Sequence, residues 1–269
     1  MSPNPTANET RSETLMAGFV RYERDLEATT AYLGVGYTER APDYWELITN
    51  QSLNTGSSFH TDVEKTAQID TGLNYRRGTF TAFVAGFYNQ VNDYILVQNK
   101  VPKGMSTATV TRNIDASSCG GEAGFVYTWA ERWKVDASLA YVRGRNRTDN
   151  LPLAQQAPLE GRFSLTYATS VWSVGGLARF VAEQNRFALN QGTIAGQDLG
   201  PTPDYAVLSL NAGWRVSAHA VLTAGVDNLF DKLYAEHISR SGSVITGYPT
   251  TTRINEPGRT VWAKWTVSF

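Results

Sequence analysis

Apolar and polar positions alternate along most of this chain, and the last segment shows the pattern most plainly. Its apolar positions are Val261, Ala263, Trp265, Val267 and Phe269. The positions between them are polar, with Trp262 as the bulky exception. Successive side chains of a β-strand point to opposite faces, so this segment predicts a strand with one apolar face and one polar face.

Between Glu13 and Phe269 we count about eleven such segments, and their connections are short and long in strict turn. The short connections are predicted around Asp25, at 76–78, 131–133, 169–170 and 217–218. The long connections are rich in Pro, Gly, Asn and Ser and are predicted at roughly 41–62, 99–107, 145–158, 185–203 and 235–257. Short turns at one end and long loops at the other are typical of single-chain outer-membrane barrels. The sequence therefore predicts an all-β fold, a transmembrane antiparallel β-barrel, over residues 1–269.

The positions of charged and aromatic residues fit this prediction. Several charged residues fall on the polar face of their segment, and lipid offers such charges no partner, so that face is expected to line a wet lumen. Trp129, Trp133 and Trp214 lie beside short connections, where an aromatic girdle at the membrane interface would form. The alternation is weak over 79–98, where Phe residues occur on both faces.

Composition narrows the class of protein further. Hydrophobic residues make up 42% of the chain and aromatic residues 12%, which suits a wall that is apolar on one face only. A net charge of −1 argues against a nucleic-acid partner, which would need a basic patch. The single cysteine, Cys119, excludes an intrachain disulfide framework.

The first residues, 1–10, are polar and contain two prolines, so they do not form a secretory signal peptide. Counting back from a last strand that ends at the periplasm places 1–12 in an external loop. About eleven strands would be half of a 22-stranded barrel, the size that holds a plugged lumen. We therefore expect this chain to be a piece of a longer protein.

Several stretches resemble the C-terminal half of TonB-dependent outer-membrane receptors. Val226-Asp-Asn-Leu-Phe-Asp-Lys-Leu-Tyr234 is similar to that family's Asn-Leu-Phe-Asp-Lys-x-Tyr motif, and Glu256-Pro-Gly-Arg-Thr260 leads into the last strand as its Pro-Gly-Arg does. Segments 37–47, 64–75 and 113–122 resemble earlier strands of the barrel. Within the family the chain looks most like the TonB-dependent copper receptor group, on segments such as 152–162 and 234–240.

The resemblance implies a receptor that captures a metal ion or metal chelate and passes it to the periplasm when the TonB complex acts on a plug. The plug and the TonB-binding segment would belong to a missing N-terminal part. The implied surroundings are lipid and the outer membrane of a Gram-negative bacterium. A siderophore receptor is the close alternative, and a diffusion porin or a soluble β-rich binding protein remains open.

Copper favours sulfur and imidazole ligands, so His60, Met105 and His237 in three long connections are the candidate ligand-binding residues. Each could instead be an ordinary loop residue, and no spacing defines a metal site. Charged residues of the predicted lumen face could guide a ligand, or pair with one another or with a plug. These are Asp70, Glu122, Arg179, Arg215 and Asp227. No nucleophile elbow, phosphate loop or zinc-protease motif occurs, so we expect neither catalysis nor a cofactor.

Overall fold

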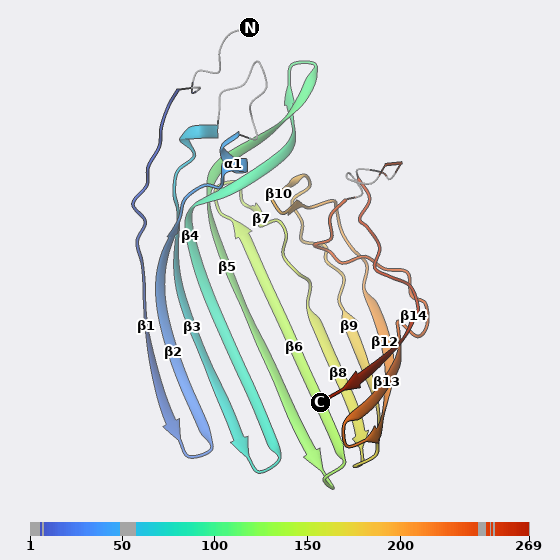
Figure 1. Ribbon diagram of the computed structural model, residues 1–269. Coiled ribbons are helices and arrows are strands. Elements are labelled where there is room, and N and C mark those ends of the chain that lie inside the picture. Colours follow the sequence, from blue (N-terminus) through green and yellow to red (C-terminus); the bar gives the residue numbers. More distant parts are fainter. Residues whose placement is uncertain are drawn as a thin grey trace.

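The computed structural model describes residues 6, 8–48, 58–241, 246–247, 249 and 251–268. They form one antiparallel sheet that curves around a common inner side (Figure 1). Eleven strands follow one another in chain order across it. They are β1 (Ala17–Leu26), β2 (Thr29–Arg40), β3 (Glu64–Arg77), β4 (Phe80–Lys103), β5 (Ser106–Trp129), β6 (Trp133–Asn146), β8 (Glu160–Ala168), β9 (Trp172–Val181), β12 (Tyr205–Ser217), β13 (Ala220–Asp227) and β14 (Thr260–Val267). The all-β prediction and the number of long strands are confirmed.

Small elements occur in the connections at one end of the sheet. These are α1 (Tyr44–Ile48), a 3-10 turn (Ser58–His60), β7 (Leu151–Pro152), β10 (Gln191–Thr193) and β11 (Gly196–Gln197). None of the described helices is long and apolar enough to cross a membrane. Phe269, the expected last outward side chain, lies outside the described residues.

All five short connections lie together at the lower end of the sheet in Figure 1. The first turn is at Glu27 and Ala28, two residues beyond the predicted Asp25, which belongs to β1. Positive φ angles at Glu27 (51°) and Gly78 (57°) let the strands reverse within two residues, as the tight hairpin turns require.

The predicted long connection at 99–107 is wrong. β4 continues to Lys103 and β5 starts at Ser106, so only Gly104 and Met105 form the turn of a long hairpin that rises beyond its neighbours (Figure 1). β10 pairs with Val97 and Gln98 on the free side of β4, which gives this extension a second hydrogen-bonded neighbour. That support comes from residues almost a hundred positions away, so the local sequence did not reveal it.

Strand register confirms that the sheet has one apolar face and one polar face. Ile69 of β3 lies opposite Tyr88, whereas Asp70, one position on, lies opposite Phe87 and Gly34. Because directly opposed residues share a face, the same register assigns Leu139 to the outer face and Glu122 to the inner face.

The mixed pattern at 79–98 has a structural explanation. Phe83 and Phe87 are on the inner, polar face, and each is directly opposite a glycine of β5. A Cβ atom added at Gly124 would lie 2.7 Å from the Phe83 ring, and one at Gly120 would lie 2.8 Å from the Phe87 ring. The rings therefore lie flat across glycines and remain packed against the wall, an arrangement known to stabilise sheets.

A row of aromatic rings follows the outer face at the short-turn end. Trp129 and Trp133 stack with ring centroids 5.8 Å apart, and Trp133 meets Tyr167 at 4.8 Å. The row consists of Tyr75, Phe80, Tyr127, Trp129, Trp133, Tyr167 and Trp172. Trp214 lies directly opposite Trp172 in the register of β12 and β9. The predicted aromatic girdle is thus present beside the short turns.

The buried core lies at the opposite end, above the aromatic row. Val91, Leu96, Ile114 and Ala116 of the β4–β5 hairpin pack together with Leu153 of the connection after β6. Ile95 is fully buried nearby. The connection after β6 is therefore packed onto the β4–β5 hairpin by an apolar cluster.

Candidate functional site on the inner wall and external loops

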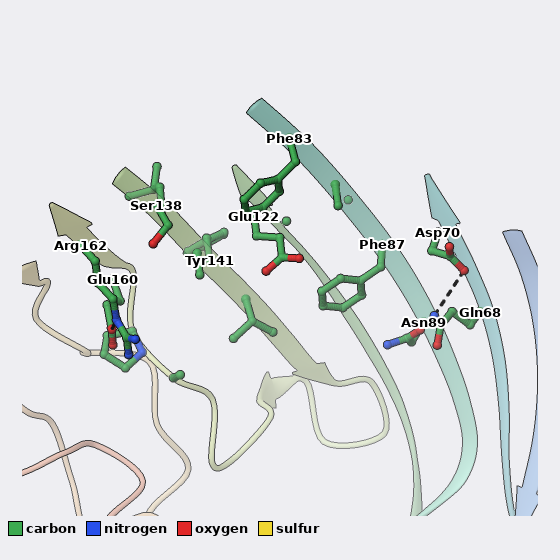
Figure 2. A pocket seen from close by; sticks show the side chains of 18 of the residues that line it. Gln68, Asp70, Phe83, Phe87, Asn89, Glu122, Ser138, Tyr141, Glu160 and Arg162 are labelled. Carbon is green, nitrogen blue, oxygen red and sulfur yellow. Dashed lines mark hydrogen bonds and ion pairs between the residues drawn. The ribbon is translucent and has the colours of Figure 1, made fainter. Parts of the chain in front are cut away.

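A hollow of about 880 Å³ lies on the inner face of β3 to β8 (Figure 2). Asp70, Glu122, Glu160 and Arg162 contribute charged groups to its lining. Glu122 is directly opposite Ala85, between the positions of Phe83 and Phe87, and its carboxylate lies between their rings in Figure 2. The hollow thus combines carboxylates with aromatic faces on a rigid sheet.

Asp70 is held close to the wall. Its Oδ1 accepts a long hydrogen bond of 3.5 Å from Gln68 Nε2. A Cβ atom at the opposing Gly34 would lie 2.7 Å from the same oxygen, so the glycine gives this carboxylate its space. Asp70 and Glu122, two of the predicted lumen charges, therefore belong to one hollow.

Arg179 is bound by two carboxylates, those of Glu160 and Glu236. Its Nη2 donates to Glu160 Oε2 at 2.6 Å and to Glu236 Oε2 at 3.1 Å, and its Nη1 donates to Glu236 Oε1. Tyr205 also donates its hydroxyl to Glu236 Oε2, at 2.7 Å. Glu236 belongs to the connection after β13, so Arg179 ties that loop to the wall.

The other two predicted lumen charges lie elsewhere. Asp227 ends β13 at the loop side and lines a smaller hollow of about 330 Å³ together with Arg179. Arg215 is exposed near the short turn after β12. The structure therefore gathers Asp70 with Glu122 and Arg179 with Asp227, and leaves Arg215 apart from both pairs.

The three candidate ligand residues lie in three separate connections. His60 is exposed, with Nε2 3.4 Å from Glu9 Oε2, and Met105 is fully exposed at the hairpin turn. His237 is 1% exposed, with Nδ1 3.0 Å from Thr202 Oγ1. Within the described ranges, no three or more His, Cys, Asp or Glu side chains group closely enough to hold a metal. The ligand role of these residues stays a prediction.

No sequence pattern pointed to Asp198, the most buried polar group among the described residues of the loops. Burial tends to raise the pKa of its carboxyl, but hydrogen bonds from His237, the amides of Ala188 and Gln155 and the Gln155 side chain outweigh burial and lower this pKa. The residue sits in an otherwise unremarkable Gln-Asp-Leu-Gly stretch. Its partners come from residues 43 positions before it and 39 positions after it, so no local signal marks it.

Taken together, these features define a class of protein. The sheet has an apolar outer face, a polar inner face, an aromatic row beside short turns and long loops at the other end, as the wall of an outer-membrane β-barrel does. Residues 5–229 match the family model described as TonB dependent receptor-like, beta-barrel. The chain belongs to this family and is part of a barrel of the Gram-negative outer membrane.

Two relatives illustrate the range within the family. The solved copper transporter OprC is 45% identical, with a TM-score of 0.92 over 99% of this chain and 41% of that one. The ferric enterobactin receptor of Pseudomonas aeruginosa is 26% identical over 90% of this chain and 36% of the receptor. A crystal structure of a mutant of that receptor has a TM-score of 0.68 at 22% identity, which shows a shared fold. The chain thus spans well under half the length of these proteins.

Proposed function

We propose that this chain, over residues 1–269, is the C-terminal half of the β-barrel of a receptor that imports copper across the outer membrane. The observation that carries this proposal is the 45% identity to the copper transporter OprC over 99% of the chain. The likeness extends through strands and loops alike, because the TM-score of 0.92 covers almost every residue.

In this proposal the external loops meet the metal first. His60 and Met105 are the exposed candidates, and imidazole and thioether groups are ligands that suit copper. The carboxylates of Asp70 and Glu122 would then give the inner wall a negative potential along the path of a cation. Contact with the TonB complex is proposed for other parts of the receptor.

A ferric siderophore is the second candidate ligand. It is favoured by the match to the ferric enterobactin receptor over 90% of this chain, although the identity there is 26%. The aromatic faces of Phe83 and Phe87 in the inner hollow could contact an organic chelate, whereas a bare ion would gain little from them.

The test uses the full-length receptor, produced in cells that lack their own copper and siderophore receptors. Cell-associated copper is measured by mass spectrometry, and growth on ferric enterobactin is measured in parallel. Copper accumulation without growth on the chelate supports the proposal. Growth on the chelate without copper accumulation would replace it with the siderophore alternative.

Variants then test the loop residues. We expect His60→Ala combined with Met105→Ala to weaken copper binding by at least roughly 10-fold, because loss of even a group that only supports a metal ligand costs about 10–100-fold. His219→Ala is the matched control, because His219 lies in the short turn between β12 and β13, on the other side of the membrane. Equal effects of both changes would remove the loop residues from the proposal.

A further inference from the structure

Asp198 joins two external connections through hydrogen bonds to backbone and side chain. Its Oδ1 accepts from the Gln155 amide at 2.9 Å and from Gln155 Nε2 at 3.2 Å. Its Oδ2 accepts from the Ala188 amide at 2.8 Å. Gln155 belongs to the connection 147–159, while Asp198 and Ala188 belong to 182–204, so one buried carboxylate holds the two together.

A third connection, 228–259, is added by His237. Its imidazole is buried, with Nδ1 3.0 Å from Thr202 Oγ1 and Nε2 3.5 Å from Asp198 Oδ1. The tautomer with its proton on Nε2 suits both neighbours, because Nε2–H then faces the carboxylate and Nδ1 accepts from the Thr202 hydroxyl. The ring therefore sits between two groups of the 182–204 connection.

Arg253 strengthens the same junction from the far side of its loop. Its Nε donates to the carbonyl of His237 at 2.9 Å, and its Nη2 donates to the carbonyl of Gly200 at 2.6 Å. Its Nη1 reaches the carbonyl of Pro201 at 3.3 Å. One guanidinium group thus binds the backbone of 182–204 and of 228–259 at once.

The joined loops are also fixed to the barrel wall. Glu236, next to His237, is bound by Arg179 of β9 and Tyr205 of β12. Gln184 of the 182–204 connection donates through Nε2 to the carbonyl of Gln156 in 147–159, at 3.2 Å.

We propose that Asp198, Thr202, His237 and Arg253 form a latch that makes the described parts of the connections 147–159, 182–204 and 228–259 one rigid body. The physical reason is that a buried carboxylate holding several donors is costly to release, since opening one loop leaves polar groups of all three without partners. α1 contributes no residue to the latch. The three latched loops should therefore stay in place or move together when a ligand binds.

The latch does not rest on the identity of the transported ligand. It is tested on the full-length receptor in detergent by hydrogen exchange followed with mass spectrometry. The variant is Asp198→Asn, and the matched control is Asp204→Asn, an exposed carboxylate in the same connection. We expect Asp198→Asn to speed exchange in all three latched loops together by roughly tenfold or more. Exchange in α1, within 41–63, should remain unchanged, and the control should alter none of these segments.

Faster hydrogen exchange confined to 182–204 would show that Asp198 stabilises only its own connection, and this would overturn the proposal. Unchanged exchange in all three loops would overturn it as well. If Asp198→Asn does not reach the membrane, Thr202→Val removes one hydrogen bond of the latch and takes its place. Exchange should then rise in 182–204 and 228–259 together, and unchanged exchange in 228–259 would contradict the latch.

Discussion

At the short-turn end of the sheet, β5 and β6 are joined by three residues, and the side chains there form a row of rings on the outer face. At the loop end, the upper parts of the strands together with the connections between them carry most of the described buried side chains, both apolar and polar. The wall is held by its backbone ladder, which lipid does not disturb, because lipid offers no competing hydrogen bonds. The loops meet water and need a core and a polar network of their own.

The largest expected difference between the two regions concerns the apolar core of the loops. Leu96 is 1% exposed in the loop-end cluster, whereas Leu73 is 47% exposed on the outer face of β3. Leu96→Ala should lower the free energy of unfolding by about 2–5 kcal/mol, because it leaves a cavity. Leu73→Ala should cost less than about 1 kcal/mol. Denaturant unfolding of the receptor in detergent compares the two variants. Equal losses of unfolding free energy would contradict the distinction between a buried core at the loop end and an exposed outer face.

A second prediction concerns the inner face of the wall, where space is set by glycine. A Cβ atom at Gly120 would lie 2.5 Å from the carbonyl oxygen of Tyr141 and 2.8 Å from the Phe87 ring. Gly120→Ala should therefore cost about 1–3 kcal/mol of unfolding free energy through overpacking. Gly161→Ala is the control, because its nearest neighbour would be 3.6 Å away. If both variants unfold at the same denaturant concentration, the packing argument is wrong.

The aromatic row should contribute less. Trp133 contacts Trp129 and Tyr167, and each aromatic pair is worth about 0.5–1.5 kcal/mol beyond its buried area. Trp133→Ala should lower stability by roughly that amount per pair, and Trp133→Phe should recover part of it by keeping a ring. The temperature at which the folded barrel disappears from unheated gels gives the measurement. A Phe variant as unstable as Ala would mean that ring contacts do not matter here.

The smallest expected difference concerns pH. It arises from the ionised carboxylate of Asp198 and is confined to the latch. The pKa of Asp198 is lowered in the folded protein. The stability that its ionised carboxylate contributes is therefore fully present above the pKa of the unfolded chain, about 3.9. It is lost as the pH falls through the lower folded value. Tyr94, His237 and Arg253 are the other titratable groups that act on this carboxylate or are acted on by it.

Hydrogen exchange of the three latched loops should therefore increase below about pH 4, while the wall strands stay protected. Asp198→Asn should remove this pH dependence, and Asp204→Asn should leave it intact. An unchanged pH profile in the Asp198 variant would assign the effect to other groups.

The two regions also differ in how far they could be predicted. The wall was predicted strand by strand, because a period of two repeats over many residues and each short turn carries its own signal. The Asn-Leu-Phe-Asp-Lys motif that carried the family resemblance forms a local structure, because Asn228 binds the carbonyl and the amide of Lys232. The loop end was predicted less well, since 99–107 was assigned to a loop and Asp198 was not noticed.

By itself, the sequence determined the strand pattern, the two faces and the family, because these depend on residues that are neighbours along the chain. Only the tertiary structure decided that Phe83 and Phe87 lie over glycines of β5, that β10 extends the β4–β5 hairpin, and that Asp198 meets His237. Each of these contacts joins residues that are distant in sequence. Its energy depends on burial and on the alignment of donors with acceptors, which exist only once the sheet and its loops have come together.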